Sequence, residues 1–138
     1  AVDLGAKIAE FPTTFIAAQA ARKAGLEVMV GTPNLVCGGS HSGNVSAAQL
    51  ASEGLATALS SDYVPLSLLQ GVFLLTNPKI GLSLPKSVSY ASRAPALAVG
   101  LEDRGHIAPE CIADLIRVQM LNNLPIIAGV WRKGKRVA

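Results

Sequence analysis

VMVGTPNLVCGGSHSGNVSAAQLASEG, Val28 to Gly54, is the stretch that decides the fold. It opens with a short apolar run, Val28–Val30, passes through a glycine-rich segment, and ends in a helical pattern that Gly54 closes. Ser46 and Gln49 have the spacing of a capping box, which predicts that the helix starts at Ser46. An apolar strand, a loop and a capped helix in this order are typical of one βα unit of an α/β protein.

Similar units lie on both sides of this stretch. Before it, a strand is predicted at Ala6–Glu10, followed by a helix from Thr13 or Thr14 to about Ala24 that Gly25 ends. After it, a strand is predicted at Ala58–Ser61, with Asp62 at its end and a helix that begins near Pro65. Three strand–loop–helix units in a row predict right-handed crossovers and a parallel sheet.

The remainder of the chain changes character after Asn77. Two short helices are predicted within Leu84–Leu101, separated at Arg93–Pro95, and from Glu102 the pattern becomes β-like. A strand is expected near Ala113–Gln119, and a last pair, around Ile126–Trp131 and Arg136–Val137, is expected to turn at Lys133–Gly134. These strands predict a small sheet appended to the α/β part.

Composition narrows the class of protein. The 138 residues are half hydrophobic and 15% charged, which suits one compact domain with a buried parallel sheet, or a piece of a larger body. No run reaches the ~18 apolar residues of a membrane span, and no secretory signal is visible, so a cytoplasmic protein that binds no membrane is expected.

Cys37 and Cys111 show no metal-type pairing. The net charge of +3 and the 4% of aromatic residues argue against nucleic-acid binding, and the basic run at residues 131–136 is interpreted as a solvated turn.

The glycine-rich segment is the first candidate for chemistry. Gly38, Gly39 and Gly43 allow backbone N–H groups to converge on an anion, and a helix amino terminus follows at once. Side-chain donors come from Ser40, His41, Ser42 and Asn44. No Walker-type lysine follows the glycines, so a phosphate-binding loop and an ordinary connecting loop both remain open.

Carboxylates at strand ends are the second candidate. Asp62 can bind a metal or accept a proton, but the residues alone favour the cap of the helix that follows. Glu10 is either functional or merely solvated, and His106 is expected to be an exposed loop residue. With His41 and His106 as its only histidines, the chain does not form a histidine-rich metal centre by itself.

Four motifs together resemble the phosphonate-metabolism branch of the amidohydrolase superfamily. They are EFPTT (10–14), GTPNLVCGGSHSGNVSA (31–47), SSDYVP (60–65) and the tail RGHIAPECIADLIRV (104–118) followed by WRKGKRV (131–137). The resemblance implies an α/β fold built as a distorted (β/α)8 barrel with a small β-sandwich. Residues 1–101 would then be the carboxyl-terminal part of the barrel, about its last three βα units, and residues 102–138 the carboxyl-terminal strands of the composite sandwich. Ala94 and Glu110 depart from the superfamily pattern, at positions where they affect local turns.

The resemblance also implies an enzyme. The expected reaction is metal-dependent hydrolysis of a ribose 5-triphosphate phosphonate, which releases pyrophosphate in phosphonate catabolism. Asp62 matches the aspartate that binds metal and accepts a proton from the hydrolytic water. The substrate's phosphates are expected to meet Gly38, Gly39, His41, Ser42 and Asn44, whereas Glu10 occupies a strand-end position whose role stays open.

Cofactor and partners follow from the same resemblance. A divalent metal is expected, zinc first and magnesium or manganese as alternatives, bound mostly by residues absent from this chain. The expected partners are a phosphorylated small molecule, the rest of the same enzyme and a second copy of the chain in a homo-oligomer, and the isolated chain is expected to be inactive. Two other functions stay open, namely a different amidohydrolase reaction (cyclic-amide hydrolysis or deamination) and a non-catalytic anion-binding module.

Overall fold

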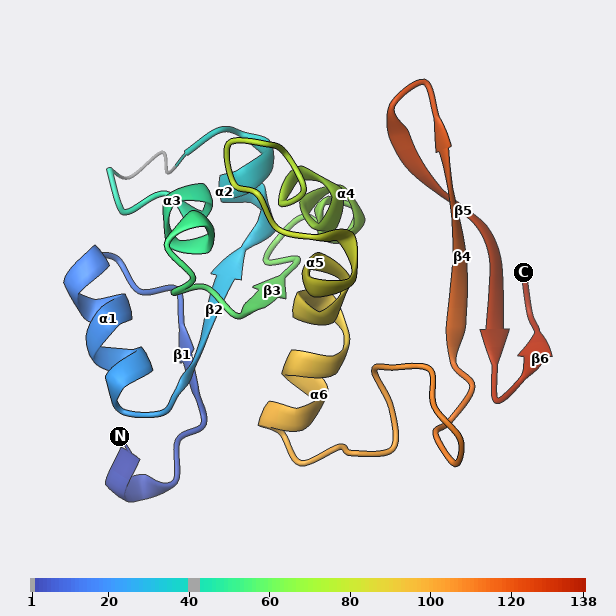
Figure 1. Ribbon diagram of the computed structural model, residues 1–138, viewed down its shortest axis with the longest axis horizontal. Helices are drawn as coiled ribbons and strands as arrows, with labels where there is room; N and C mark the ends of the chain where they lie inside the picture. The colour runs from blue at the N-terminus through green and yellow to red at the C-terminus, as the bar shows by residue number, and fades with distance from the viewer. Residues whose placement is uncertain (1, 40–42) are drawn as a thin grey trace.

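The computed structural model describes residues 2–39 and 43–138, which form an α/β part and a separate antiparallel sheet (Figure 1). A 3-10 turn, η1 (Val2–Leu4), precedes three parallel strands in the order β1 (Ile8–Glu10), β2 (Glu27–Gly31) and β3 (Ala58–Ser60). Ile8 pairs with Glu27, and Met29 pairs with Ala58. The predicted parallel sheet is therefore confirmed, with its strands in chain order.

Helix α1 (Phe15–Lys23) connects β1 to β2 and forms for local reasons. The Thr14 hydroxyl accepts a hydrogen bond of 3.1 Å from the Ala17 amide, which caps the first turn. Gly25, with φ of +78°, follows the last turn, where a left-handed residue stops the helix. The prediction of this helix from Thr14 to about Ala24 is confirmed.

The sequence predicts a loop throughout the segment after β2, but part of this segment is helical. Thr32–Val36 forms a short helix, α2, with Pro33 in its first turn, where a missing amide proton costs nothing. The Thr32 side chain is completely buried, and its hydroxyl donates a 3.0 Å hydrogen bond to the Ser60 carbonyl at the end of β3. Helix α2 thus ties the carboxyl ends of β2 and β3 together.

Helix α3 (Ala47–Ser52) is capped differently from the prediction. Ser46 occupies the N-cap position, but its side chain caps no amide. Instead the Asn34 Oδ1 of α2 accepts a 3.0 Å hydrogen bond from the Ala47 amide. The predicted capping box with Gln49 is therefore wrong, because a side chain from a neighbouring helix satisfies the first amide.

Helix α4 (Ser67–Leu74) packs against α2 at very short range. A Cβ atom added to Gly71 would lie 2.4 Å from Thr32 Cγ2, so only glycine permits this approach. The N-cap position of α4 is Leu66, which excludes the interpretation of Asp62 as the helix cap. Leu50, Leu75, Val28 and the other core residues lie between these helices and the parallel sheet.

Two further helices, α5 (Leu84–Ala91) and α6 (Arg93–Ala98), lie beside β3 (Figure 1). They confirm the predicted pair of short helices, although the break falls at Ser92, just before the expected position. Tyr90 near the end of α5 is 3% exposed. No helix in the described residues is both long and apolar enough to cross a membrane.

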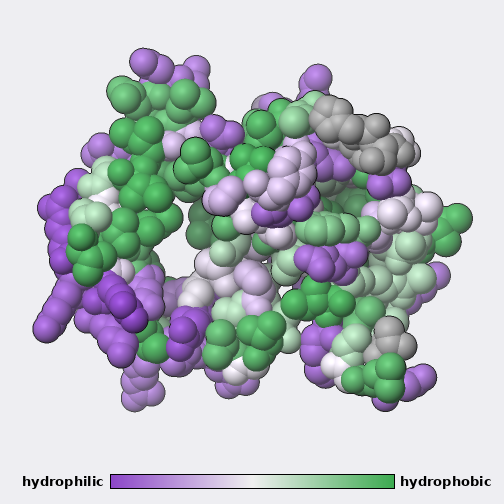
Figure 2. Space-filling model, turned by 180° about the vertical axis from the view of Figure 1, so that it is seen from behind, coloured by the Kyte–Doolittle hydropathy of each residue, from purple (hydrophilic) through white to green (hydrophobic). Residues whose placement is uncertain are grey.

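The carboxyl-terminal strands form an antiparallel sheet in the order β4 (Leu115–Leu121), β5 (Leu124–Arg132) and β6 (Lys135–Arg136). The predicted turn at Lys133–Gly134 is confirmed, and a second turn at Asn122–Asn123 also has both central residues at positive φ. The antiparallel sheet meets the α/β part where β5 contacts α4, and an opening remains beside this contact (Figure 2). Green, apolar atoms are spread over the sheet (Figure 2). Its exposed apolar residues are Leu115, Ile116, Met120, Leu121, Leu124, Ile126 and Ile127.

Candidate functional site

One cavity of about 260 Å³ opens at the carboxyl ends of the three parallel strands. Its lining comes from the segments that follow β1, β2 and β3, so each strand contributes to it. The described lining residues are Phe11, Pro12, Val30, Gly31, Pro33, Asn34, Gly39, Asn44, Val45, Ala47, Leu50, Asp62 and Tyr63. This end of a parallel sheet is where binding and catalytic groups gather in open α/β sheets and in barrels.

Asp62 follows β3 after one intervening residue, Ser61, and brings the cavity its only carboxylate among the described residues. Its backbone has φ of +51°, a left-handed conformation that Asp tolerates better than most residues, and its amide donates a 3.1 Å hydrogen bond to Ser60 Oγ. Its Oδ2 lies over Gly31, 3.2 Å from the position that a Cβ atom there would take. A side chain at residue 31 would therefore compete with the carboxylate for space at the end of β2.

The glycine-rich segment reaches the same cavity from β2. Gly39 and Asn44 line it, and the Gly39 amide donates a 2.9 Å hydrogen bond to the Asn34 carbonyl. Gly38, with φ of +76°, is exposed and is not part of the lining. His41 and Ser42, the other two predicted substrate-binding residues, lie outside the described residues.

Glu10 stands at the end of β1 but is exposed and does not line the cavity. The next residue, Phe11, turns the chain with φ of +51° and takes the position facing the cavity. Sequence reasoning missed Phe11, Asn34 and Tyr63 as lining residues. The available signal was their place, since each follows one of the three predicted strands within a few residues.

The described side chains around the cavity do not form a metal site by themselves. In residues 2–39 and 43–138, no group of three or more His, Cys, Asp or Glu side chains is arranged to hold a metal ion. Asp62 offers one carboxylate, whereas a catalytic zinc site usually has three protein ligands. The described residues of the lining therefore supply a single metal ligand, Asp62, at this place.

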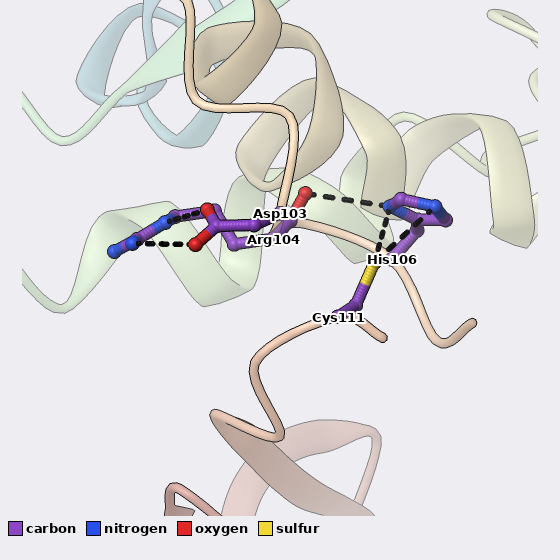
Figure 3. A network of polar contacts seen from close by, with 4 residues as sticks. All are labelled: Asp103, Arg104, His106 and Cys111. Carbon is purple, nitrogen blue, oxygen red and sulfur yellow. Dashed lines mark hydrogen bonds and ion pairs between the residues drawn. The ribbon is translucent and has the colours of Figure 1, made fainter. Parts of the chain in front are cut away.

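His106 is not the exposed loop residue that was predicted. It is half-buried in the segment between α6 and β4, and its Nε2 lies 3.7 Å from Cys111 Sγ (Figure 3). Its Nδ1 lies 3.4 Å from the Arg104 carbonyl. Arg104 in turn pairs with Asp103, at 2.9 Å between Nε and Oδ1, and this hydrogen bond lowers the pKa of the Asp103 carboxyl. None of these side chains reaches the Asp62 cavity.

The amino-acid sequence of the chain is similar to that of a known enzyme. The chain is 50% identical over 135 residues to the alpha-D-ribose 1-methylphosphonate 5-triphosphate diphosphatase of Escherichia coli (strain K12). The match covers 97% of this chain but only 36% of that protein, so the chain spans about a third of the length of this relative. No solved structure matches the chain.

The family comparison covers nearly the whole chain. The sequence model of the Amidohydrolase family matches residues 9–137, which include β2, β3, all of β1 but its first residue, the segments around the Asp62 cavity and the antiparallel sheet. The resemblance inferred from the four motifs is thereby confirmed, and the chain belongs to the amidohydrolase family.

Proposed function

We propose that this chain is the carboxyl-terminal part of a hydrolase that releases pyrophosphate from a ribose 1-methylphosphonate 5-triphosphate. The observation that carries the proposal is the 50% identity to the Escherichia coli diphosphatase over almost the whole chain. The cavity supports it independently, because one carboxylate and a glycine-rich segment share it at the carboxyl ends of parallel strands. This combination suits a substrate with a chain of phosphates.

The proposal includes a division of the chain. Residues 1–101 would provide the last three βα units of a (β/α)8 barrel, and residues 102–138 the carboxyl-terminal strands of a β-sandwich. The parallel order β1-β2-β3 and the antiparallel order β4-β5-β6 support this division. The exposed apolar side chains of β4 and β5 suit a sheet that packs against further strands of the complete enzyme.

Asp62 would act on the metal and on the proton. The family generally uses divalent metals, and a bound divalent metal lowers the pKa of a coordinated water toward neutrality. Zinc is the first candidate, with magnesium and manganese as alternatives, and residues outside the described chain would have to hold it for the most part. Asp62 would add one carboxylate ligand and accept a proton, in a position that the space over Gly31 leaves open.

The phosphates would lie along the glycine-rich segment. Gly39 and Asn44 already line the cavity, and Gly38, His41 and Ser42 belong to the same segment. We include all five in the proposed phosphate contacts. A cyclic-amide hydrolase or a deaminase of the same family would share Asp62, but its substrate would offer this segment no chain of phosphates to bind.

The test uses the complete enzyme that contains this chain, with pyrophosphate and ammonia release measured side by side. Asp62→Asn should lower pyrophosphate release by about 10²–10⁴-fold, the usual range for losing a proton-transfer group. Glu53→Gln is the matched control, since it makes the same carboxylate-to-amide change at an exposed position outside the cavity. Unchanged turnover in Asp62→Asn, or release of ammonia in place of pyrophosphate, would overturn the proposal.

A further inference from the structure

A second cavity, of about 270 Å³, lies at the opposite end of the parallel sheet. Glu27, the first residue of β2, and Thr57, the residue before β3, both line it. Its other wall comes from α5 and α6, through Lys86, Tyr90 and Arg93. The cavity is therefore separate from the Asp62 cavity, which lies at the carboxyl ends of the same strands.

Positive charge dominates this second cavity. Arg22, Lys86 and Arg93 face a single carboxylate, Glu27, so the lining carries a net charge of +2. Glu27 is already paired with Arg22 at 3.5 Å, and Arg22 also donates a 2.7 Å hydrogen bond to the Leu26 carbonyl. Within residues 2–39 and 43–138, Lys86 and Arg93 form no ion pair, which leaves two cations available to a ligand.

Tyr90 forms part of the cavity wall, between Lys86 and Arg93 along the chain. Its side chain is 3% exposed, and no buried side-chain nitrogen or oxygen atom of the described residues lacks a hydrogen-bond partner. Burial raises the pKa of Tyr90, and Arg22 and Glu27 line the same cavity.

The side chains around the hydroxyl are already arranged. Lys86 Nζ lies 5.4 Å from the centre of the Tyr90 ring, a cation–π contact that holds the ammonium beside the cavity. Arg93 starts α6, one turn after Tyr90 along the chain, and lines the same space. An ammonium, a guanidinium and a phenol hydroxyl supply donors suited to the oxygens of one small anion.

We propose that this cavity binds a small oxyanion of the phosphate class, held by Lys86, Arg93 and the Tyr90 hydroxyl. Glu27 does not prevent this, because Arg22 offsets its charge within the same wall. The site is distinct from the proposed active site in position and in residues. Anion binding at this cavity therefore does not depend on the proposed release of pyrophosphate.

The experiment measures the affinity of the 138-residue chain for inorganic phosphate by calorimetry and by the shift in its thermal midpoint, with chloride at equal ionic strength as the reference. Phosphate should bind and raise the midpoint, and Lys86→Gln with Arg93→Gln should weaken binding about tenfold or more through the loss of charge-assisted hydrogen bonds. Both side chains are exposed, so the double variant should keep the fold. Tyr90→Phe tests the hydroxyl with little change of shape.

The control variant is Asn44→Ala in the Asp62 cavity, which should leave phosphate binding at the second cavity unchanged. Three results would overturn the proposal. They are no phosphate-specific binding, equal affinity in the Lys86→Gln/Arg93→Gln variant, and loss of binding in Asn44→Ala alone. The last result would assign the anion to the Asp62 cavity and would support the proposed function instead.

Discussion

Replacing Gly71 with alanine should reveal how tightly α4 packs against α2. The added methyl carbon would lie 2.4 Å from Thr32 Cγ2 and 3.0 Å from Thr32 Cβ, both well inside normal contact. Thr32 cannot rotate freely, because its buried hydroxyl donates to the Ser60 carbonyl and shares a hydrogen bond with the Ser67 hydroxyl. The clash must therefore be relieved by moving a helix or by breaking these bonds.

The size of the effect follows from three contributions. Overpacking a core usually costs ~1–3 kcal/mol, and leaving a buried hydroxyl unsatisfied costs a similar ~1–3 kcal/mol. Alanine is a better helix former than glycine by about 1 kcal/mol, which offsets part of the loss. We expect Gly71→Ala to lower the free energy of unfolding by about 2–3 kcal/mol, near the middle of the range that these contributions allow.

A double-mutant cycle isolates the contact. Thr32→Ser removes the methyl group that the new Cβ meets while keeping the hydroxyl, and alone it should cost ~1 kcal/mol for a buried methyl. In the Gly71→Ala background the same change should restore stability, with a coupling of ~1–3 kcal/mol in urea-unfolding curves. Strictly additive effects of the two substitutions would show that this reasoning about the α2–α4 contact is wrong.

Three further predictions use unfolding measurements on matched variants. Asn34→Ala should lower the free energy of unfolding by about 1 kcal/mol because the first amide of α3 loses its acceptor, while Ser46→Ala should change it little. A larger loss in Ser46→Ala than in Asn34→Ala would instead support the predicted capping box. Burial raises the pKa of Tyr90 above 10.0, so the folded state holds this proton more tightly than the unfolded state. The resulting stabilisation is complete below pH 10.0 and is lost as the pH rises above it. The same alkaline loss of stability in a Tyr90→Phe variant would contradict this assignment. Gly105→Ala would place its Cβ 2.7 Å from the Arg93 backbone at the start of α6. It should lower the free energy of unfolding far more than Gly100→Ala, where φ is also positive but no atom lies within 4 Å. Equal losses of stability in the two variants would contradict the close approach at Gly105.

The elements that depend on neighbours in sequence were predictable. Thr14 and Gly25 bound α1 because capping and left-handed termination involve residues only a few positions apart. The Lys133–Gly134 turn was predictable for the same reason. The failures need contacts across the fold, since the Asn34 cap of α3 forms only after α2 has folded beside it.

The candidate site was predictable in position more than in detail. Parallel strands predict that residues at their carboxyl ends meet, and Asp62, Gly39 and Asn44 do line one cavity. Glu10 fails to line it because the left-handed turn at Phe11 directs that next residue to the cavity instead. Such a turn at a bulky residue has no signal in the sequence, and neither does the contact between the half-buried His106 and Cys111.

The two turns with paired positive φ values have a consequence for the order of folding. Asn122–Asn123 and Lys133–Gly134 each join strands that are adjacent along the chain, so the carboxyl-terminal sheet needs only short loops to close. The parallel sheet must first bring Ile8 to Glu27 and Met29 to Ala58 across whole helices, and such long-range pairing is slow. The single tryptophan, Trp131, lies on β5, and its fluorescence should therefore recover early in refolding, before the α/β part has assembled.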